Sequence, residues 1–156
     1  MIEYKAPSYP DNYAYRFSLF LAGSIEMGLA EKWQDRVVSA LSEFDIDIFN
    51  PRRDDWDSSW EQVKENKQFK EQVEWELDHI DIADHILFYF DPSTKSPVSM
   101  LELGIVLSTN GKSGVTVCCP SGFWRKGNVD IVCERYGVTV HNNLDSALEA
   151  MMEIIP

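Results

Sequence analysis

A single carboxylate, Glu102, interrupts an apolar stretch over residues 96–107 with the sequence SPVSMLELGIVL. An ionised carboxylate among apolar side chains is costly unless it is paired with a cation or used in chemistry. In enzymes, a carboxylate can also act as a nucleophile. The residues alone leave two interpretations of Glu102: a structural carboxylate held by a cation, or a nucleophile.

A second carboxylate, Glu76, also borders an apolar surface. Residues 60–83 follow a helical pattern whose apolar residues recur on one stripe: Phe69, Val73, Leu77 and Ile80. Glu76 lies one turn before Ile80 and next to this stripe, which puts it at the edge of the interior. The other acids of the segment are interpreted as its solvated face.

Two loops combine aromatic and charged residues. The loop over residues 50–60 carries Trp56 and Trp60 among aspartates, but it lacks the glycine and the alternating oxygen ligands of an EF-hand. Two alternatives stay open for it: a solvated acidic loop, or a lid whose tryptophans stack on a planar ligand. The loop over residues 120–128 is basic, and its Arg125 either contacts a phosphate or is simply solvated.

Nearly continuous apolar runs alternate with helical patterns along the chain. The runs predict strands over residues 16–22, 46–49, 85–90, 114–119 and 138–140. The helical patterns predict helices over residues 29–44, 60–83, from 97 onward, 129–136 and 144–155. Residues 1–15 lack periodicity, so we expect an irregular N-terminal arm followed by one domain over residues 16–156.

This alternation predicts an α/β fold: a single doubly wound domain with a five-stranded parallel sheet, flavodoxin- or Rossmann-like, in the strand order 2-1-3-4-5. In such sheets, ligands bind beyond the carboxyl ends of the strands, where the strand order switches. The loops after the first and third strands carry Gly23 and Ser24 on one side and residues 96–102 on the other. The fold therefore predicts that these two segments meet at a ligand site.

The composition limits the partners and the compartment. The chain has 156 residues and a formal net charge of −12, which argues against a nucleic-acid partner but allows small anionic ligands. The absence of a signal-peptide pattern and of a long apolar run argues against a membrane, and the odd number of cysteines against a disulfide framework, so we expect a cytoplasmic protein. The three histidines lie on separate elements, so we expect no metal site.

Several of these segments resemble the nucleoside 2-deoxyribosyltransferase family, including its hydrolytic branch, the 2′-deoxynucleoside 5′-phosphate N-hydrolases. The matching pieces are FLAGS over residues 20–24, Glu76 with Asp84 eight residues later, LELG over residues 101–104, and the region of Asn128. The resemblance spans about residues 16–150. The ordered set with its spacings carries it, because each short piece alone matches by chance.

The resemblance implies catalytic roles for two residues. Glu102 corresponds to the nucleophilic glutamate that attacks the anomeric C1′ and expels the base. Glu76 stands where family members carry an aspartate that assists proton transfer. The implied function is cleavage or transfer at the N-glycosidic bond of a (deoxy)nucleoside or its 5′-monophosphate, without a cofactor. Two alternatives are a nucleotide sensor that has lost turnover and an enzyme that cleaves a dinucleotide such as NAD.

The resemblance also implies how the substrate is held. Gly23 and Ser24 would bind the 5′ end of the sugar. Ser96 lies six residues before the glutamate, where nucleoside transferases carry an acid and nucleotide hydrolases a serine, so a 5′-phosphate is expected. Asn128 matches a residue that a neighbouring subunit supplies, which implies a homo-oligomer with shared active sites. Trp56 and Arg125 complete the expected binding residues.

Overall fold

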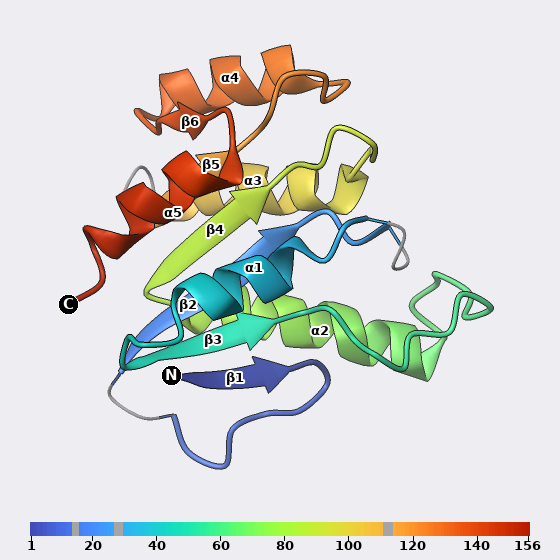
Figure 1. Cartoon of the computed structure of the whole chain (residues 1–156). Helices are drawn as coiled ribbons and strands as arrows, with labels where there is room; N and C mark the ends of the chain where they lie inside the picture. Colours follow the sequence, from blue (N-terminus) through green and yellow to red (C-terminus); the bar gives the residue numbers. More distant parts are fainter. Residues whose placement is uncertain (14–15, 27–29, 111–113) are drawn as a thin grey trace.

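The computed structural model of the chain describes residues 1–13, 16–26, 30–110 and 114–156. Its centre is a six-stranded sheet in the order β1-β3-β2-β4-β5-β6, with every neighbouring pair parallel (Figure 1). The strands are β1 Ile2–Lys5, β2 Phe17–Gly23, β3 Ile46–Asn50, β4 His85–Tyr89, β5 Val115–Cys118 and β6 Val140–His141. The helices are α1 Trp33–Ala40, α2 Lys67–Ile82, α3 Pro97–Asn110, α4 Lys126–Arg135 and α5 Leu144–Met152.

The number of strands corrects one expectation. Strands β2 to β6 follow the predicted parallel order 2-1-3-4-5, but β1 adds a sixth strand at the edge beside β3. It lies within residues 1–15, which were expected to be irregular. The four residues IEYK alternate only twice between apolar and polar side chains, which is too short a run to indicate a strand. Backbone pairing with β3 stabilises this strand, which the local sequence alone does not predict.

The start of α2 also differs from the expectation of a helix from residue 60. The Asn66 side chain accepts a hydrogen bond from the Phe69 amide at 3.0 Å, so α2 begins at Lys67. Residues 61–66 are turns and irregular backbone. This later start leaves residues 51–66 as one long loop after β3, long enough to fold over the end of the sheet.

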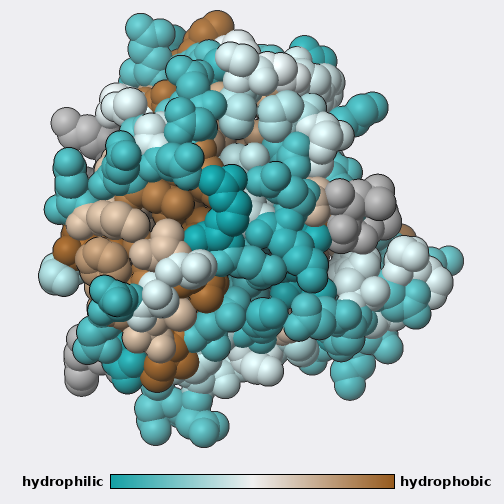
Figure 2. Space-filling view, viewed as in Figure 1, coloured by the Kyte–Doolittle hydropathy of each residue, from teal (hydrophilic) through white to brown (hydrophobic). Residues whose placement is uncertain are grey.

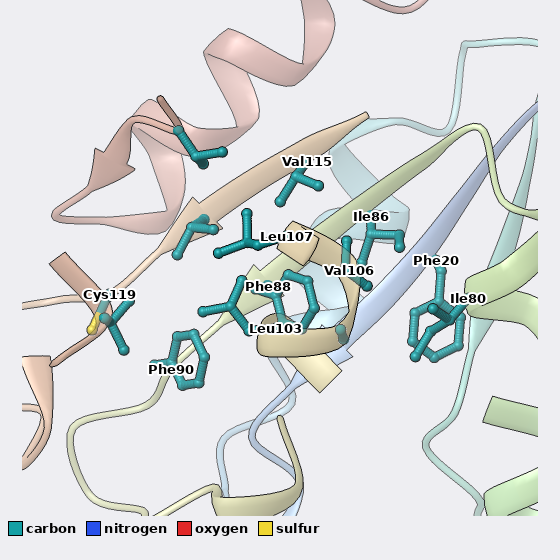
Figure 3. Packing of buried hydrophobic residues seen from close by; sticks show 14 of the residues in the cluster. Phe20, Ile80, Ile86, Phe88, Phe90, Leu103, Val106, Leu107, Val115 and Cys119 are labelled. Atoms are coloured by element: carbon teal, nitrogen blue, oxygen red, sulfur yellow. The ribbon is translucent and has the colours of Figure 1, made fainter. Parts of the chain in front are cut away.

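Helices cover both faces of the sheet. Side chains of α1 and α5 pack into one buried cluster, and side chains of α2, α3 and α4 pack into the other (Figure 1). In the second cluster, Leu103, Val106 and Leu107 point from α3 toward Phe88 and Phe90 (Figure 3). These contacts fix the rotation of α3 about its axis. Glu102 therefore lies at the border of the buried face of α3.

The surface is mainly hydrophilic on the face formed by α1 and α5, with apolar residues gathered toward the end of α5 (Figure 2). Met152 and Ile154 are exposed there. Among the described residues, no helix combines the length and the apolar character needed to cross a membrane.

Gly23 sits where β2 and β4 approach most closely, and it generates a stability prediction. Its φ is +144°, and a Cβ at this position would lie 2.2 Å from the Tyr89 carbonyl oxygen. We expect Gly23→Ala to lower the free energy of unfolding by more than about 2 kcal/mol in urea denaturation. Gly104→Ala is the matched control, because a Cβ on Gly104 meets nothing within 4 Å. It should be neutral or stabilising by up to about 1 kcal/mol, and equal effects of the two changes would contradict the prediction.

Candidate functional site

A cavity of about 310 Å³ opens at the carboxyl ends of β2, β3 and β4. The loops after these strands, α2 and the start of α3 form its walls. The main lining residues are Gly23, Ile25, Glu26, Arg52, Arg53, Trp56, Phe69, Gln72, Val73, Glu76, Ser96, Pro97, Val98, Ser99 and Glu102. The two segments that the fold was expected to bring together, around Gly23 and over residues 96–102, do meet in this cavity.

Glu102 and Glu76 form a carboxyl pair in the wall of the cavity. Glu102 is 7% exposed, while Glu76 reaches from α2 and is half-buried. The two carboxyl groups lie close enough for each to shift the pKa of the other. Gln72 orients the pair, because its Nε2 donates to Glu76 Oε1 at 2.7 Å and to the Pro51 carbonyl at 2.9 Å.

Burial and mutual repulsion decide the charge of this pair. Burial raises the pKa of Glu76 to about 7. Burial and the neighbouring Glu76 carboxylate raise the pKa of Glu102 well above its usual range. Two carboxyl groups in contact cannot easily both ionise, so at neutral pH the pair holds one proton between them. Among the described residues, none of the ion pairs between a Lys or Arg and a carboxylate involves Glu102, so the interpretation of a carboxylate held by a structural cation gains no support there.

Backbone amides converge at the start of α3. The amides of Lys95 and Ser96 donate to Glu26 Oε1 at 2.8 and 2.7 Å. The Ser96 hydroxyl shares hydrogen bonds with Ser24 Oγ at 2.5 Å and Thr94 Oγ1 at 2.9 Å. Ser96 and Glu26 line the cavity, whereas Ser24 is buried behind them and is not part of the lining. Ser24 therefore acts on the site through Ser96.

The long loop after β3 supplies the opposite wall. Trp56 lines the cavity and contacts Trp60 edge to face, with 5.2 Å between ring centroids. The Arg53 guanidinium lies 5.1 Å from the Trp60 ring and binds Asp55 with two hydrogen bonds of 2.9 Å. Trp56 Nε1 and Arg53 Nη1 are buried and find no hydrogen-bond acceptor within the described part of the chain. They are donors that a ligand can satisfy.

Arg52 ties the loops together. It is almost fully buried, and its guanidinium donates to the carbonyls of Ala30 and Glu31, each at 3.0 Å. These contacts join the loop after β3 to the loop after β2. The hydrogen bonds of Arg52 thereby fix the wall of the cavity that the loop after β3 forms.

Besides Ser24, two further expected binding residues lie outside the cavity lining. Asn128 and Arg125 are exposed at the start of α4, and neither lines the cavity of its own chain. The Arg125 guanidinium stacks 4.5 Å from the Trp124 ring. The sequence analysis missed Glu26 and Gln72, although Gln72 lies one helical turn before Glu76 and so carries a usable signal.

The structure offers no preformed metal centre in the described ranges, where no group of three or more His, Cys, Asp or Glu side chains converges. His79 is fully buried and stacks on Trp75, with 3.9 Å between ring centroids. Burial lowers the pKa of His79, which keeps this core ring neutral.

The carboxyl pair should destabilise the fold as pH rises. A carboxyl whose folded pKa is raised contributes full stability below its unfolded pKa of about 4.3, and this contribution is lost as pH rises through the folded pKa. We expect Glu102→Gln to gain stability over the wild type between pH 5 and pH 8, on the order of 2 kcal/mol, in urea unfolding. Glu149→Gln, at an exposed position on α5, is the control. A difference for Glu102→Gln that stays constant with pH would sink the prediction.

Comparison with known proteins agrees with this geometry. A search among curated proteins finds no relative of the chain. The family model described as "Nucleoside 2-deoxyribosyltransferase like" matches residues 16–123. This range runs from β2 to the loop before α4 and includes every lining residue of the cavity. Members of the family cleave or transfer the N-glycosidic bonds of nucleosides, and this chain belongs to the nucleoside 2-deoxyribosyltransferase-like family.

Proposed function

We propose that the protein cleaves the N-glycosidic bond of a nucleoside, with Glu102 as the nucleophile at C1′. The observation that carries this proposal is the buried Glu102–Glu76 pair, which holds one proton beside a cavity of nucleoside size. A nucleophile and an acid are both needed at this bond, and a pair of this kind supplies both.

In the first step, the Glu102 carboxylate attacks C1′ and the C1′–N bond breaks. The electron pair of that bond goes to the base nitrogen, and Glu76 gives its proton to the departing base. A pKa of about 7 lets Glu76 both hold and release a proton near neutral pH, and the reactive form of the pair is the one in which the shared proton lies on Glu76 and Glu102 is ionised. The product of this step is a glycosyl ester of Glu102 and a free base.

In the second step, Glu76, now ionised, accepts a proton from water as the oxygen of that water attacks C1′. The ester bond breaks, and its electron pair returns to the Glu102 carboxylate. A second base can attack C1′ in place of water, which gives transfer instead of hydrolysis. Two displacements at one carbon retain its configuration.

The longer side chain of Glu76 raised the alternative of a sensor without turnover. The contact between Glu76 and Glu102 favours catalysis, because the glutamate still reaches the nucleophile. The cavity of about 310 Å³ lies at the small end of the range for ligand sites. That size favours a nucleoside over a dinucleotide such as NAD.

The wall that carries Trp56 suits the base. Trp56, Phe69 and Val73 give this end of the cavity aromatic and apolar surface for a planar ring. The unpaired donors Trp56 Nε1 and Arg53 Nη1 can bind acceptor atoms on the edge of the base.

Product analysis tests the proposed function. Wild-type protein incubated with a panel of (deoxy)nucleosides and their 5′-monophosphates should release free base, measured by liquid chromatography. Glu102→Ala should lower kcat by about 10³-fold or more, because the nucleophile is lost. Glu76→Gln should lower kcat and remove the limb of the pH profile that reports the acid. Release of no free base from any panel member, with Glu102→Ala identical to wild type, would refute the function.

A second copy of the chain is proposed to cover the outer side of α3. Val98, Leu101 and Ile105 form an exposed apolar stripe there, and Leu101 is 66% exposed. Val98 belongs both to this stripe and to the lining of the cavity, so a partner on the stripe would reach the cavity mouth. The expected role of Asn128, to complete the site of a neighbouring subunit, requires a homo-oligomer of this kind. Two strongly acidic copies repel each other, so apolar contact must drive association.

The oligomeric state tests this contact. We expect wild-type protein to form dimers or larger oligomers in size-exclusion chromatography with light scattering, and Leu101→Asp to shift them toward monomer with loss of turnover. Leu77→Asp is the matched control, because Leu77 is an exposed leucine on α2 outside the stripe. A monomeric wild-type protein at micromolar concentration would contradict the proposal.

A further inference from the structure

The start of α3 already holds an anion, and that anion belongs to the chain itself. Glu26 Oε1 accepts from the amides of Lys95 and Ser96 at 2.8 and 2.7 Å. Free amides at the start of a helix are the place where a phosphate binds. In this chain, a carboxylate from the loop after β2 binds the two amides directly before α3, those of Lys95 and Ser96. Glu26 is half-buried and lines the same cavity as Glu102, so its negative charge faces the bound substrate.

The backbone holds Glu26 in this position. Both Glu26 and Ser96 have φ near +45°, in the left-handed region that residues other than glycine rarely adopt. Such conformations persist only where the surroundings enforce them, and they collect at functional sites. The hydrogen bond from the Ser96 amide to Glu26 links these two residues directly.

Among the described residues that line the cavity, both arginines are already bound to other groups, and Nη1 of Arg53, at the wall that carries Trp56, keeps an unpaired donor. Its lining contains three carboxylates and two arginines. Arg52 donates to backbone carbonyls, and Arg53 is bound by Asp55 and lies 3.8 Å from Glu71. The Lys95 ammonium lies 5.9 Å from the Trp124 ring, and Lys95 is not part of the lining. A dianion beside Ser96 would face the Glu26 carboxylate directly.

We infer that Glu26 selects a free 5′-hydroxyl and excludes a 5′-phosphate. The inference rests on the proposed function. A 5′-hydroxyl donates its proton to the Glu26 carboxylate, which keeps both amide hydrogen bonds, and it accepts from the Ser96 hydroxyl. A 5′-phosphate beside Ser96 meets the like charge of Glu26, which already binds the amides of Lys95 and Ser96. The preferred substrates are therefore nucleosides, which reverses the expectation of a 5′-monophosphate drawn from Ser96.

Paired substrates test the selection. Initial rates are measured for each nucleoside of the panel and for its own 5′-monophosphate at constant ionic strength. For wild type we expect kcat/KM to favour the nucleoside by about tenfold or more. Glu26→Gln keeps an acceptor for the amides and removes the charge, so it should raise kcat/KM for the monophosphate by about tenfold. Glu26→Ala frees the amides as well and should raise it further.

The controls separate this inference from the function beneath it. Glu61→Gln, at an exposed position outside the cavity lining, should keep the wild-type ratio. Far-ultraviolet circular dichroism and melting temperature check that each variant is folded.

A wild type that prefers the monophosphate, or an unchanged ratio in Glu26→Gln, overturns the role of Glu26 while cleavage itself stands. If no substrate is turned over, the proposed function fails, and calorimetric binding of the same pairs decides the role of Glu26. Tighter binding of the nucleoside that Glu26→Gln reverses supports it, and any other binding result overturns it.

Discussion

The parallel pairing of β2 with β4 at the centre of the sheet is the constraint on which the site depends. Gly23 is the register partner of Tyr89, and the two backbones approach too closely for any side chain on Gly23. The loops that leave these strands therefore start side by side. The Ser24 hydroxyl then joins them, because it accepts from the Asp91 amide at 2.8 Å and shares a hydrogen bond with Ser96. Backbone geometry thus sets the polar end of the cavity before any substrate binds.

This frame holds two carboxyl groups against each other at a cost in stability. An apolar pair of similar volume would fill the same space between α2 and α3 with less penalty. The buried face of α3, with Leu103, Val106 and Leu107 against the sheet, supplies the packing that offsets the cost (Figure 3). Local interactions that oppose folding are expected where a sequence serves chemistry. The carboxyl pair is the clearest such place among the described residues.

The sequence predicted those features that depend on long periodic segments. Five strands and their order follow from short apolar runs that alternate with helical patterns, but the stripe predicted on α2 is only partly buried, because Ile80 is buried and Leu77 is exposed. The edge strand β1 escaped prediction because its four residues carry almost no pattern and pair with β3 more than 40 residues away. Glu76 and Glu102 lie close together because α2 and α3 pack side by side on the same face of the sheet. The sequence predicts this only once both helices have been assigned to that face.

The 5′ end of the site could not be predicted from the sequence, for a physical reason. Comparison of single positions with the family identifies only Ser96. The residue proposed to place a negative charge beside it, Glu26, lies 70 positions earlier in the chain. Glu26 reaches the amides of α3 only through a left-handed backbone conformation, and a loop without periodicity gives no sign of it. What a helix start binds depends on whether its amides are free, and that is a property of the folded chain. The proposed nucleophile lies on a helix that packs against the sheet, whereas the proposed selection at the 5′ end lies in a loop, where neighbouring segments are free to change.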